Sequence, residues 1–177
     1  MAELATTQRV FGFAGWSGSG KTTLIEKVIA HLCHRGYRIS LVKHAHHEFD
    51  IDHPGKDSFR HRQAGAAEIL ISSARRWALM HEIASPEAEL SLAQALAQLS
   101  PCDLVLVEGY KHASIPKLEV YRASVGKPLL HQQDPYIQAI ASEKSELGAL
   151  PALPCFALDD IAGIAHFILK AVGLAPR

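Results

Sequence analysis

The sequence predicts an α/β fold in three layers, with a mostly parallel central sheet and some antiparallel β additions. Two observations predict it. A glycine-rich loop at residues 15–23 lies between a short apolar segment and a segment whose apolar residues recur at helical spacing. Residues 38–42, a second apolar segment, follow shortly after Gly36. Strand, helix and strand within about 35 residues form a βαβ unit, in which the two strands are parallel.

The loop itself has the phosphate-binding pattern G-x-x-x-x-G-K-T, matched at every fixed position. Its glycines let backbone N–H groups turn toward a phosphate, and the following helix adds the partial positive charge of its N-terminus. Lys21 is expected to reach the β- and γ-phosphates, and the Thr22 hydroxyl to bind Mg²⁺. The sequence thus predicts a P-loop NTPase domain. Its expected phosphate-binding residues are Gly15, Trp16, Ser17, Gly18, Ser19, Gly20, Lys21, Thr22 and Thr23.

The first half of the chain continues this pattern. The first helix is expected over residues 21–35 and ends at Gly36, a favoured C-terminal residue. A polar loop runs from the second strand to about residue 58, and a short helix at 59–63 stops at Gly65. Apolar runs at 67–71 and 77–80 predict two strands with a tight connection.

The second half predicts a helix from Ser85-Pro86 to about residue 99, then a fully buried strand at 104–107. Residues 117–121 alternate and predict a half-exposed strand, followed by a loop at 123–134. Strands at 137–141 and 157–158 come next. The last helix is capped by Asp159 or Asp160. No linker or repeat interrupts residues 1–177, so we expect a single nucleotide-binding domain.

The composition excludes several classes of protein. Lys+Arg and Asp+Glu both total 18 and no basic stripe occurs, which argues against a nucleic-acid binder. The N-terminal residues lack the pattern of a signal peptide, and no apolar run reaches the roughly 18 residues of a membrane span. Cys33, Cys102 and Cys155 are far apart in apolar segments, which predicts buried thiols in a reducing compartment. We therefore expect a cytoplasmic protein without a membrane or nucleic-acid partner.

Glu108 is the expected carboxylate of the magnesium site, since it ends the buried strand at 104–107. Gly109 would allow the backbone to approach a ligand closely. Asp103 begins the same strand, about 15 Å away at ~3.3 Å per residue, and is expected to be a strand-entry residue.

The polar loop after the second strand is expected to face the same crevice, because ligands bind at the carboxyl ends of parallel strands. Lys43 and His44 would face the phosphates or a second substrate, and Asp57 would orient water. A solvated loop is the alternative. Histidines at 44, 46, 47 and 53 could also form a transition-metal site. The preferred interpretation is that a neutral imidazole contacts an anionic ligand.

Six segments occur in an order that resembles the molybdopterin-guanine dinucleotide biosynthesis protein B family. They are residues 15–23, 42–47, 50–58, 64–66, 76–80 and 106–112, and the resemblance covers about residues 8–170. It implies a GTP-binding, weakly GTP-hydrolysing accessory protein that works beside the guanylyltransferase attaching GMP to molybdopterin. It also implies a homodimer joined through β structure, while the expectation of Mg²⁺ as a cofactor comes from the phosphate-binding motif. Residues 67–82 and 115–135 are candidates for the dimerising β elements.

The family commonly has Ala-Ser-Asp near its guanine-binding position, where this sequence has Ala141-Ser142-Glu143. Ser142 and Glu143 are therefore candidate base-binding residues, since a carboxylate accepts from guanine N1 and the exocyclic amine. A surface glutamate that begins a loop is the alternative. Trp77 is expected in the core, and a ring presented to a pterin or a partner is the alternative.

Two functions fit the motif. In the first, a GTP-binding adapter hydrolyses GTP slowly with Lys21 and Asp57, or does not hydrolyse it at all. Arginines 60, 62, 75 and 76 are candidates for a contact to the transferred phosphate. The alternative is a small-molecule kinase that uses the same loop, with Lys43 holding the acceptor.

Overall fold

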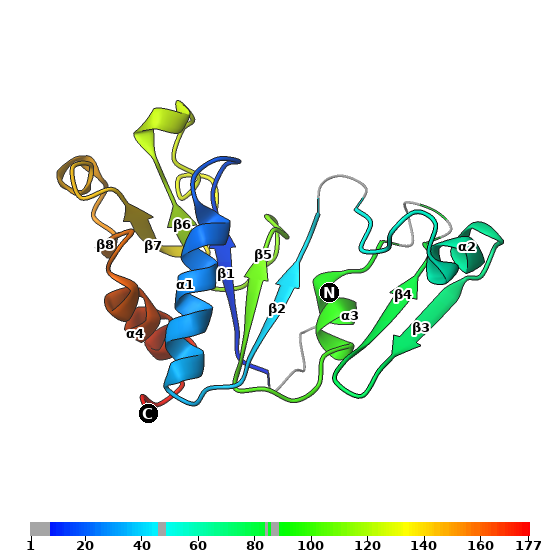
Figure 1. The fold of residues 1–177 in the computed structure, drawn as a ribbon. Helices are drawn as coiled ribbons and strands as arrows, with labels where there is room; N and C mark the ends of the chain where they lie inside the picture. Colours follow the sequence, from blue (N-terminus) through cyan, green and yellow to red (C-terminus); the bar gives the residue numbers. More distant parts are fainter. Residues whose placement is uncertain (1–7, 46–48, 84, 86–88) are drawn as a thin grey trace. The chain divides into compact units, whose positions relative to one another are not determined.

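The computed structural model describes residues 8–45, 49–83, 85 and 89–177 (Figure 1). The chain folds into two compact units, each described below by itself. The first contains the described residues up to His44 together with Leu92–Arg177, and the second is Ala45–Ser91. A single nucleotide-binding domain over residues 1–177 stays a prediction.

The first unit contains a six-stranded sheet in the order β2-β5-β1-β6-β7-β8, and all of its described pairings are parallel. This confirms the predicted α/β class. The strands are β1 Val10–Ala14, β2 Ile39–Lys43, β5 Leu104–Glu108, β6 Lys117–Val120, β7 Ile137–Ser142 and β8 Cys155–Ala157. β5 lies between β1 and β2, so its carboxyl end adjoins the ends of both.

Helices cover both faces of this sheet. α1 (Lys21–His34) and α4 (Ile161–Ala171) lie side by side (Figure 1) and share a core with Phe11 and Leu106. α3 (Leu92–Ala97) packs in the second core, which contains Val105 and Val107 of β5. Because successive side chains of a strand point to opposite faces, β5 contributes side chains to both cores and is buried throughout.

Several elements differ from the prediction. Of the helix expected from Ser85 to residue 99, only α3 (Leu92–Ala97) is helical; residues 89–91 are not, and 86–88 lie outside the described residues. β8 begins at Cys155, before the expected residue 157. Short 3₁₀ turns lie at Ala123–Val125, within the expected loop, and at Leu147–Ala149.

β6 was expected to be half exposed, and that prediction is wrong: all four of its residues are buried. Lys117 Nζ is 2.6 Å from Asp134 Oδ2, and Glu119 accepts hydrogen bonds from the backbone N–H groups of Leu130 and His131 at 2.7 and 3.0 Å. The charged face of the strand is therefore covered by the 130–134 loop, which supplies partners for both charges.

The second unit contains α2 (Asp57–Gln63) and the antiparallel hairpin of β3 (Glu68–Ser72) and β4 (Trp77–His81). The two expected strands and their tight connection are confirmed. α2 begins at Asp57 rather than at residue 59. Trp77 is 67% exposed, so its expected place in the core is wrong.

Two expectations from composition concern the cysteines and the membrane. Cys33 is exposed on α1, so the prediction of a buried thiol is wrong there, while Cys102 and Cys155 are partly buried. None of the helices in the described part of the chain has the length and apolar content of a membrane span.

Candidate phosphate-binding site

The glycine-rich loop turns the chain from the end of β1 into α1, which begins at Lys21. Gly15, Gly18 and Gly20 have φ values of 142°, 81° and 93°, conformations that side chains disfavour. Gly15 also has no room for a Cβ, which would lie 2.5 Å from the backbone oxygen of Val120. The glycines at the two ends of the motif thus fix a loop that is seated against the end of β6.

Lys21 crosses the inside of this loop. Its Nζ donates to the backbone oxygens of Gly15 at 2.7 Å and Trp16 at 2.9 Å. Burial lowers the pKa of Lys21, and the charges of Lys111 and Lys43 lower it further, while Glu108 opposes the shift. Several cations therefore converge around the loop, and an anion bound there would relieve their repulsion. Ser19 Oγ is buried and has no hydrogen-bond partner among the described residues, as expected of a group that could donate to a bound oxygen.

Thr22 and Glu108 meet beside the loop. Thr22 Oγ1 donates to Glu108 Oε1 at 3.0 Å, and Glu108 is 8% exposed. Lys43 Nζ lies 3.6 Å from Glu108 Oε2, because β2 and β5 pair in a register that puts the two residues opposite each other. A hydroxyl and a carboxylate oxygen are the donors that Mg²⁺ prefers, so these residues fit that ion.

Gly109 lets β2 and β5 approach closely after their ends. Its φ is 93°, and a Cβ there would lie 2.7 Å from His44 Cβ. His44 donates its backbone N–H to the Glu108 carbonyl at 2.8 Å, and its ring is 4.8 Å from that of Tyr110. His44 and Lys43 thus both lie beside the candidate magnesium residues.

The other flank of the loop contacts the segments that follow β6 and β7. Arg122 Nε donates to the backbone oxygen of Ser19 at 3.1 Å, and its Nη1 lies 2.5 Å from Glu143 Oε1. Ser142 is buried and donates its hydroxyl hydrogen to Glu146. This hydrogen bond is the main reason why the pKa of Glu146 is lowered. The two expected base-binding residues therefore lie on the Arg122 side of the phosphate loop.

The side chain of Trp16, a residue of the loop, is held by contacts outside the loop. Its Nε1 donates to the Pro128 carbonyl at 2.8 Å, and Lys111 and Lys127 each place Nζ 5.8 Å from the centre of its ring. The segment after β6 thus holds the phosphate loop at two points, Trp16 and Ser19.

Asp57 and the polar loop from Ala45 onward belong to the second unit, and the expected place of Asp57 at the phosphates stays a prediction. Within that unit, Arg62 contacts Asp50 at 2.6 Å and Glu82 at 3.3 Å. Among the described residues no group of three His, Cys, Asp or Glu side chains could hold a metal ion. His46 and His47 lie outside those residues.

Asp103 is a strand-entry residue, as expected. It accepts the backbone N–H of Arg38 at 2.7 Å and pairs with Arg177 at 2.8 Å, at the opposite end of β5 from Glu108. Arg122 and Glu119 were not among the expected residues. For Glu119 a signal was available, because Lys117 and Glu119 are charged residues in an otherwise apolar strand.

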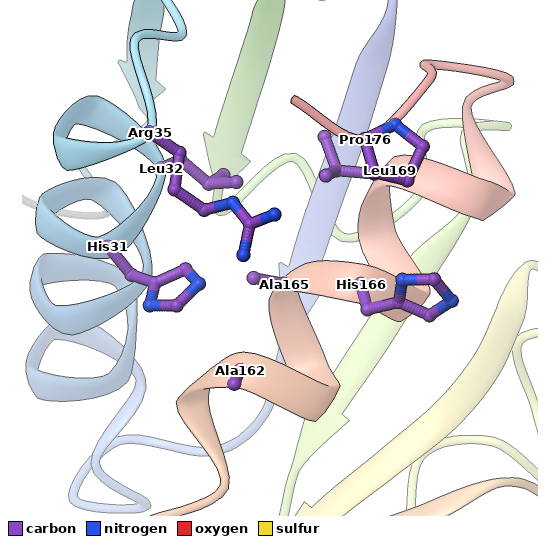
Figure 2. A pocket seen from close by; sticks show the side chains of 8 residues that line it. All are labelled: His31, Leu32, Arg35, Ala162, Ala165, His166, Leu169 and Pro176. Atoms are coloured by element: carbon purple, nitrogen blue, oxygen red, sulfur yellow. The ribbon is translucent and has the colours of Figure 1, made fainter.

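A small pocket lies between α1 and α4, at the far end of α1 from the phosphate loop. Figure 2 shows His31 on α1 and Arg35, the residue that follows this helix, on one side and His166 on α4 on the other. His31 is ten residues beyond Lys21, which is about 15 Å along a helix. This pocket is therefore separate from the phosphate loop.

Comparisons with known proteins identify the family. The family model described as molybdopterin guanine dinucleotide synthesis protein B matches residues 10–143. The chain is 42% identical over 163 residues to the molybdopterin-guanine dinucleotide biosynthesis adapter protein of Escherichia coli K12, covering 91% of each chain. It is 43% identical over 133 residues to the protein of the same name from Haemophilus influenzae, covering 75% of this chain and 74% of that one.

Solved structures agree with this match. A crystal structure of molybdopterin-guanine biosynthesis protein B is similar with a TM-score of 0.69 and 27% identity, over 91% of this chain and 98% of that chain. A MobB homologue from Bacillus stearothermophilus gives a TM-score of 0.64 and 26% identity, over 94% and 99%. The resemblance that the ordered motifs carry is therefore confirmed, and this chain belongs to the molybdopterin guanine dinucleotide synthesis protein B family.

Proposed function

We propose that this protein binds GTP with Mg²⁺ and acts as an adapter in the attachment of GMP to molybdopterin. The observation that carries the proposal is the set Lys21, Thr22 and Glu108 at the phosphate loop, in a chain whose curated relatives are named molybdopterin-guanine dinucleotide biosynthesis adapter proteins. The expected partners are the molybdopterin guanylyltransferase and molybdopterin or the molybdenum cofactor, and the expected compartment is the cytoplasm.

The triphosphate would enter the loop at the N-terminus of α1. Its oxygens would compete with the Gly15 and Trp16 carbonyls for the Lys21 ammonium, which now donates to both. Thr22 and Glu108 would hold Mg²⁺, which neutralises phosphate charge when bound. Lys43, which lies beside Glu108, would reach the same phosphates.

The base would lie where β6 and β7 end, beside Ser142 and Glu143. Ser142 is buried, whereas Glu143 is exposed, so the Glu143 carboxylate is the group that would accept from guanine N1 and the exocyclic amine. In the same position adenine presents an acceptor at N1, which repels a carboxylate. Glu143 is exposed and thus accessible to a base.

Any hydrolysis would be slow. Lys21 would stabilise charge that develops on the γ-phosphate, and Asp57 would orient the attacking water. Asp57 is exposed at the start of α2. Whether it reaches the phosphates is therefore a test of the proposal, which a single-turnover GTPase measurement on Asp57→Asn provides.

The hairpin of the second unit supports the proposed homodimer. Leu70, Trp77 and Leu79 are 62%, 67% and 45% exposed, so β3 and β4 leave apolar side chains uncovered in this chain. A second copy that extends the β structure would bury them and satisfy the hairpin edges. The segment at 115–135 is the weaker candidate, since β6 is an interior strand of the sheet.

Calorimetric titration tests the nucleotide proposal. The wild-type protein is expected to bind GTP more tightly than ATP in the presence of Mg²⁺, and more tightly still with the guanylyltransferase present. Lys21→Ala should abolish binding, while Lys170→Ala, an exposed lysine at the end of α4, should leave it unchanged. Equal affinity for GTP and ATP would exclude the guanine assignment, and full affinity of Lys21→Ala would exclude the loop.

The alternative is a small-molecule kinase. Lys43 favours it, because an exposed ammonium beside Glu108 could hold an anionic acceptor near the phosphates. A kinase would transfer the γ-phosphoryl group to the acceptor faster than it hydrolyses the nucleotide. Incubation with labelled nucleotide and molybdopterin, with the product separated from free phosphate, distinguishes the two functions.

A further inference from the structure

One arginine joins the phosphate loop to the segment that follows β7. Arg122 is the second residue after the end of β6. Its guanidinium contacts both Ser19 and Glu143. Nε, Nη2 and Cζ lie only 3.4, 3.6 and 3.9 Å from the position that a Cβ on Gly20 would occupy. The guanidinium is therefore packed along the last two residues of the loop before Lys21.

The backbone around Arg122 is fixed to the same segment. The N–H of Ala123 donates to Glu146 Oε1 at 2.9 Å, while Glu146 Oε2 accepts the Ser142 hydroxyl. The N–H of Glu146 donates to the Glu143 carbonyl at 2.9 Å, which closes the turn after β7. Glu143 is thus held through its side chain by Arg122 and through its backbone by the turn.

The pairing with Arg122 leaves Glu143 able to bind a second group. An ionised carboxylate has about four lone-pair sites, and the described contact occupies Oε1 only. A carboxylate accepts from two neighbouring donors and repels an acceptor.

We propose that Arg122 is the positioning residue for base selection: it holds the Glu143 carboxylate at a fixed place relative to the phosphate loop, so that a bound triphosphate brings a purine with donors at N1 and C2 against it. The inference rests on the proposed function, because Glu143 is the base-reading group there. Arg122 links the base-reading carboxylate to the phosphate loop, because one rigid guanidinium donates to the loop from Nε and to the Glu143 carboxylate from Nη1.

This coupling predicts that removing Arg122 weakens the preference for GTP over ITP more than it weakens binding of the phosphates. Without Arg122, Glu143 is free to rotate away from the base, while Lys21 and Thr22 still bind the phosphates. A partly exposed ion pair is worth at most about 1 kcal/mol, which corresponds to about fivefold in the ratio of affinities. The ratio, not the affinity alone, carries the test.

The experiment compares the dissociation constants of GTP, ITP and tripolyphosphate in the presence of Mg²⁺. ITP lacks the 2-amino group of GTP, and tripolyphosphate lacks the nucleoside. In the wild type, GTP should bind more tightly than ITP. In Arg122→Ala the GTP-to-ITP preference should fall about fivefold, and tripolyphosphate affinity should change less than GTP affinity. Arg122→Lys should restore part of the preference, because lysine keeps the charge without the fork.

A double-mutant cycle separates positioning from a general structural effect. Glu143→Gln should lower the same preference in the wild-type background and have little further effect in Arg122→Ala. Arg35→Ala is the matched control, an exposed arginine that bonds the C-terminal residue near the other end of α1, and should leave all three constants unchanged. Thermal unfolding checks that each variant is folded.

The outcomes distinguish this inference from the proposed function. An unchanged GTP-to-ITP preference in folded Arg122→Ala and Arg122→Lys, in a wild type that binds GTP, would overturn only the role of Arg122. A wild type that binds no nucleotide would overturn the proposed function itself. Additive effects of Arg122→Ala and Glu143→Gln would show that the two side chains act separately, and would also overturn the inference.

Discussion

Replacing Gly15 by alanine should destabilise the protein far more than the same change at Gly18, although both glycines belong to one loop and have positive φ. At Gly18 (φ 81°) a Cβ would meet nothing within 4 Å. The cost there is the left-handed conformation alone, about 1 to 2 kcal/mol. At Gly15 (φ 142°) the same atom would lie 2.5 Å from Val120 O and 2.8 Å from Ser19 Oγ.

The contact at Gly15 is with backbone, which cannot rotate away. Conformational strain and overpacking together should therefore reach roughly 2 to 5 kcal/mol for Gly15→Ala. Urea unfolding followed by circular dichroism measures the difference. With a slope of about 2 kcal/mol per molar urea, the midpoint should fall by roughly 1 M or more for Gly15→Ala, and by less than about 1 M for Gly18→Ala. Equal midpoints for the two variants would show that the loop is not seated against β6, and would refute the reasoning.

Three further predictions concern the site and its support. Tripolyphosphate affinity should fall as pH rises through the pKa of Lys21, which burial lowers from 10.5, because the neutral amine no longer attracts phosphate. Titrations from neutral to alkaline pH should show this fall, and Lys21→Arg, whose guanidinium stays charged, should lack it. Thr22→Val removes the hydroxyl that donates to Glu108, so the ratio of GTP affinities with and without Mg²⁺ should fall toward one. Glu119→Ala leaves two backbone N–H groups unpaired, so urea unfolding should show a free energy of unfolding lower by about 1 to 3 kcal/mol for each of them. Glu26 is exposed, and Glu26→Ala should change the free energy of unfolding by less than about 0.5 kcal/mol.

The pKa of Glu119 is raised mainly by burial, against two backbone hydrogen bonds that lower it. A carboxyl whose folded pKa lies above its unfolded value binds protons more readily in the folded protein. Its contribution to stability is therefore complete below the unfolded pKa, near 4.5, and is lost as pH rises through the folded pKa. This loss should be absent in Glu119→Ala, which unfolding curves across the acidic range would reveal.

The sequence was sufficient for the parts of the fold that short-range patterns specify. The P-loop motif, the helix after it and the buried strand ending at Glu108 were all expected from spacing and composition, and the structure contains them. Their signals are local: glycine permits positive φ, apolar residues recur with the period of the helix, and an unbroken apolar run marks a strand buried on both faces. The position of Asp103, at the opposite end of the strand from Glu108, was predicted from the length of the strand alone.

The tertiary structure decided what covers each element. Lys117 and Glu119 alternate with apolar residues, a pattern typical of a strand with one face in water, yet the 130–134 loop covers that face and pairs both charges. Trp77 gave the opposite error, because an aromatic residue in an apolar run is expected in a core, while the hairpin leaves it exposed. Arg122 had no sequence signal, since its meaning comes from two contacts, Ser19 and Glu143, that are distant along the chain. Periodicity indicates which residues share a face, but whether that face meets water, a loop or another strand depends on contacts between distant parts of the chain.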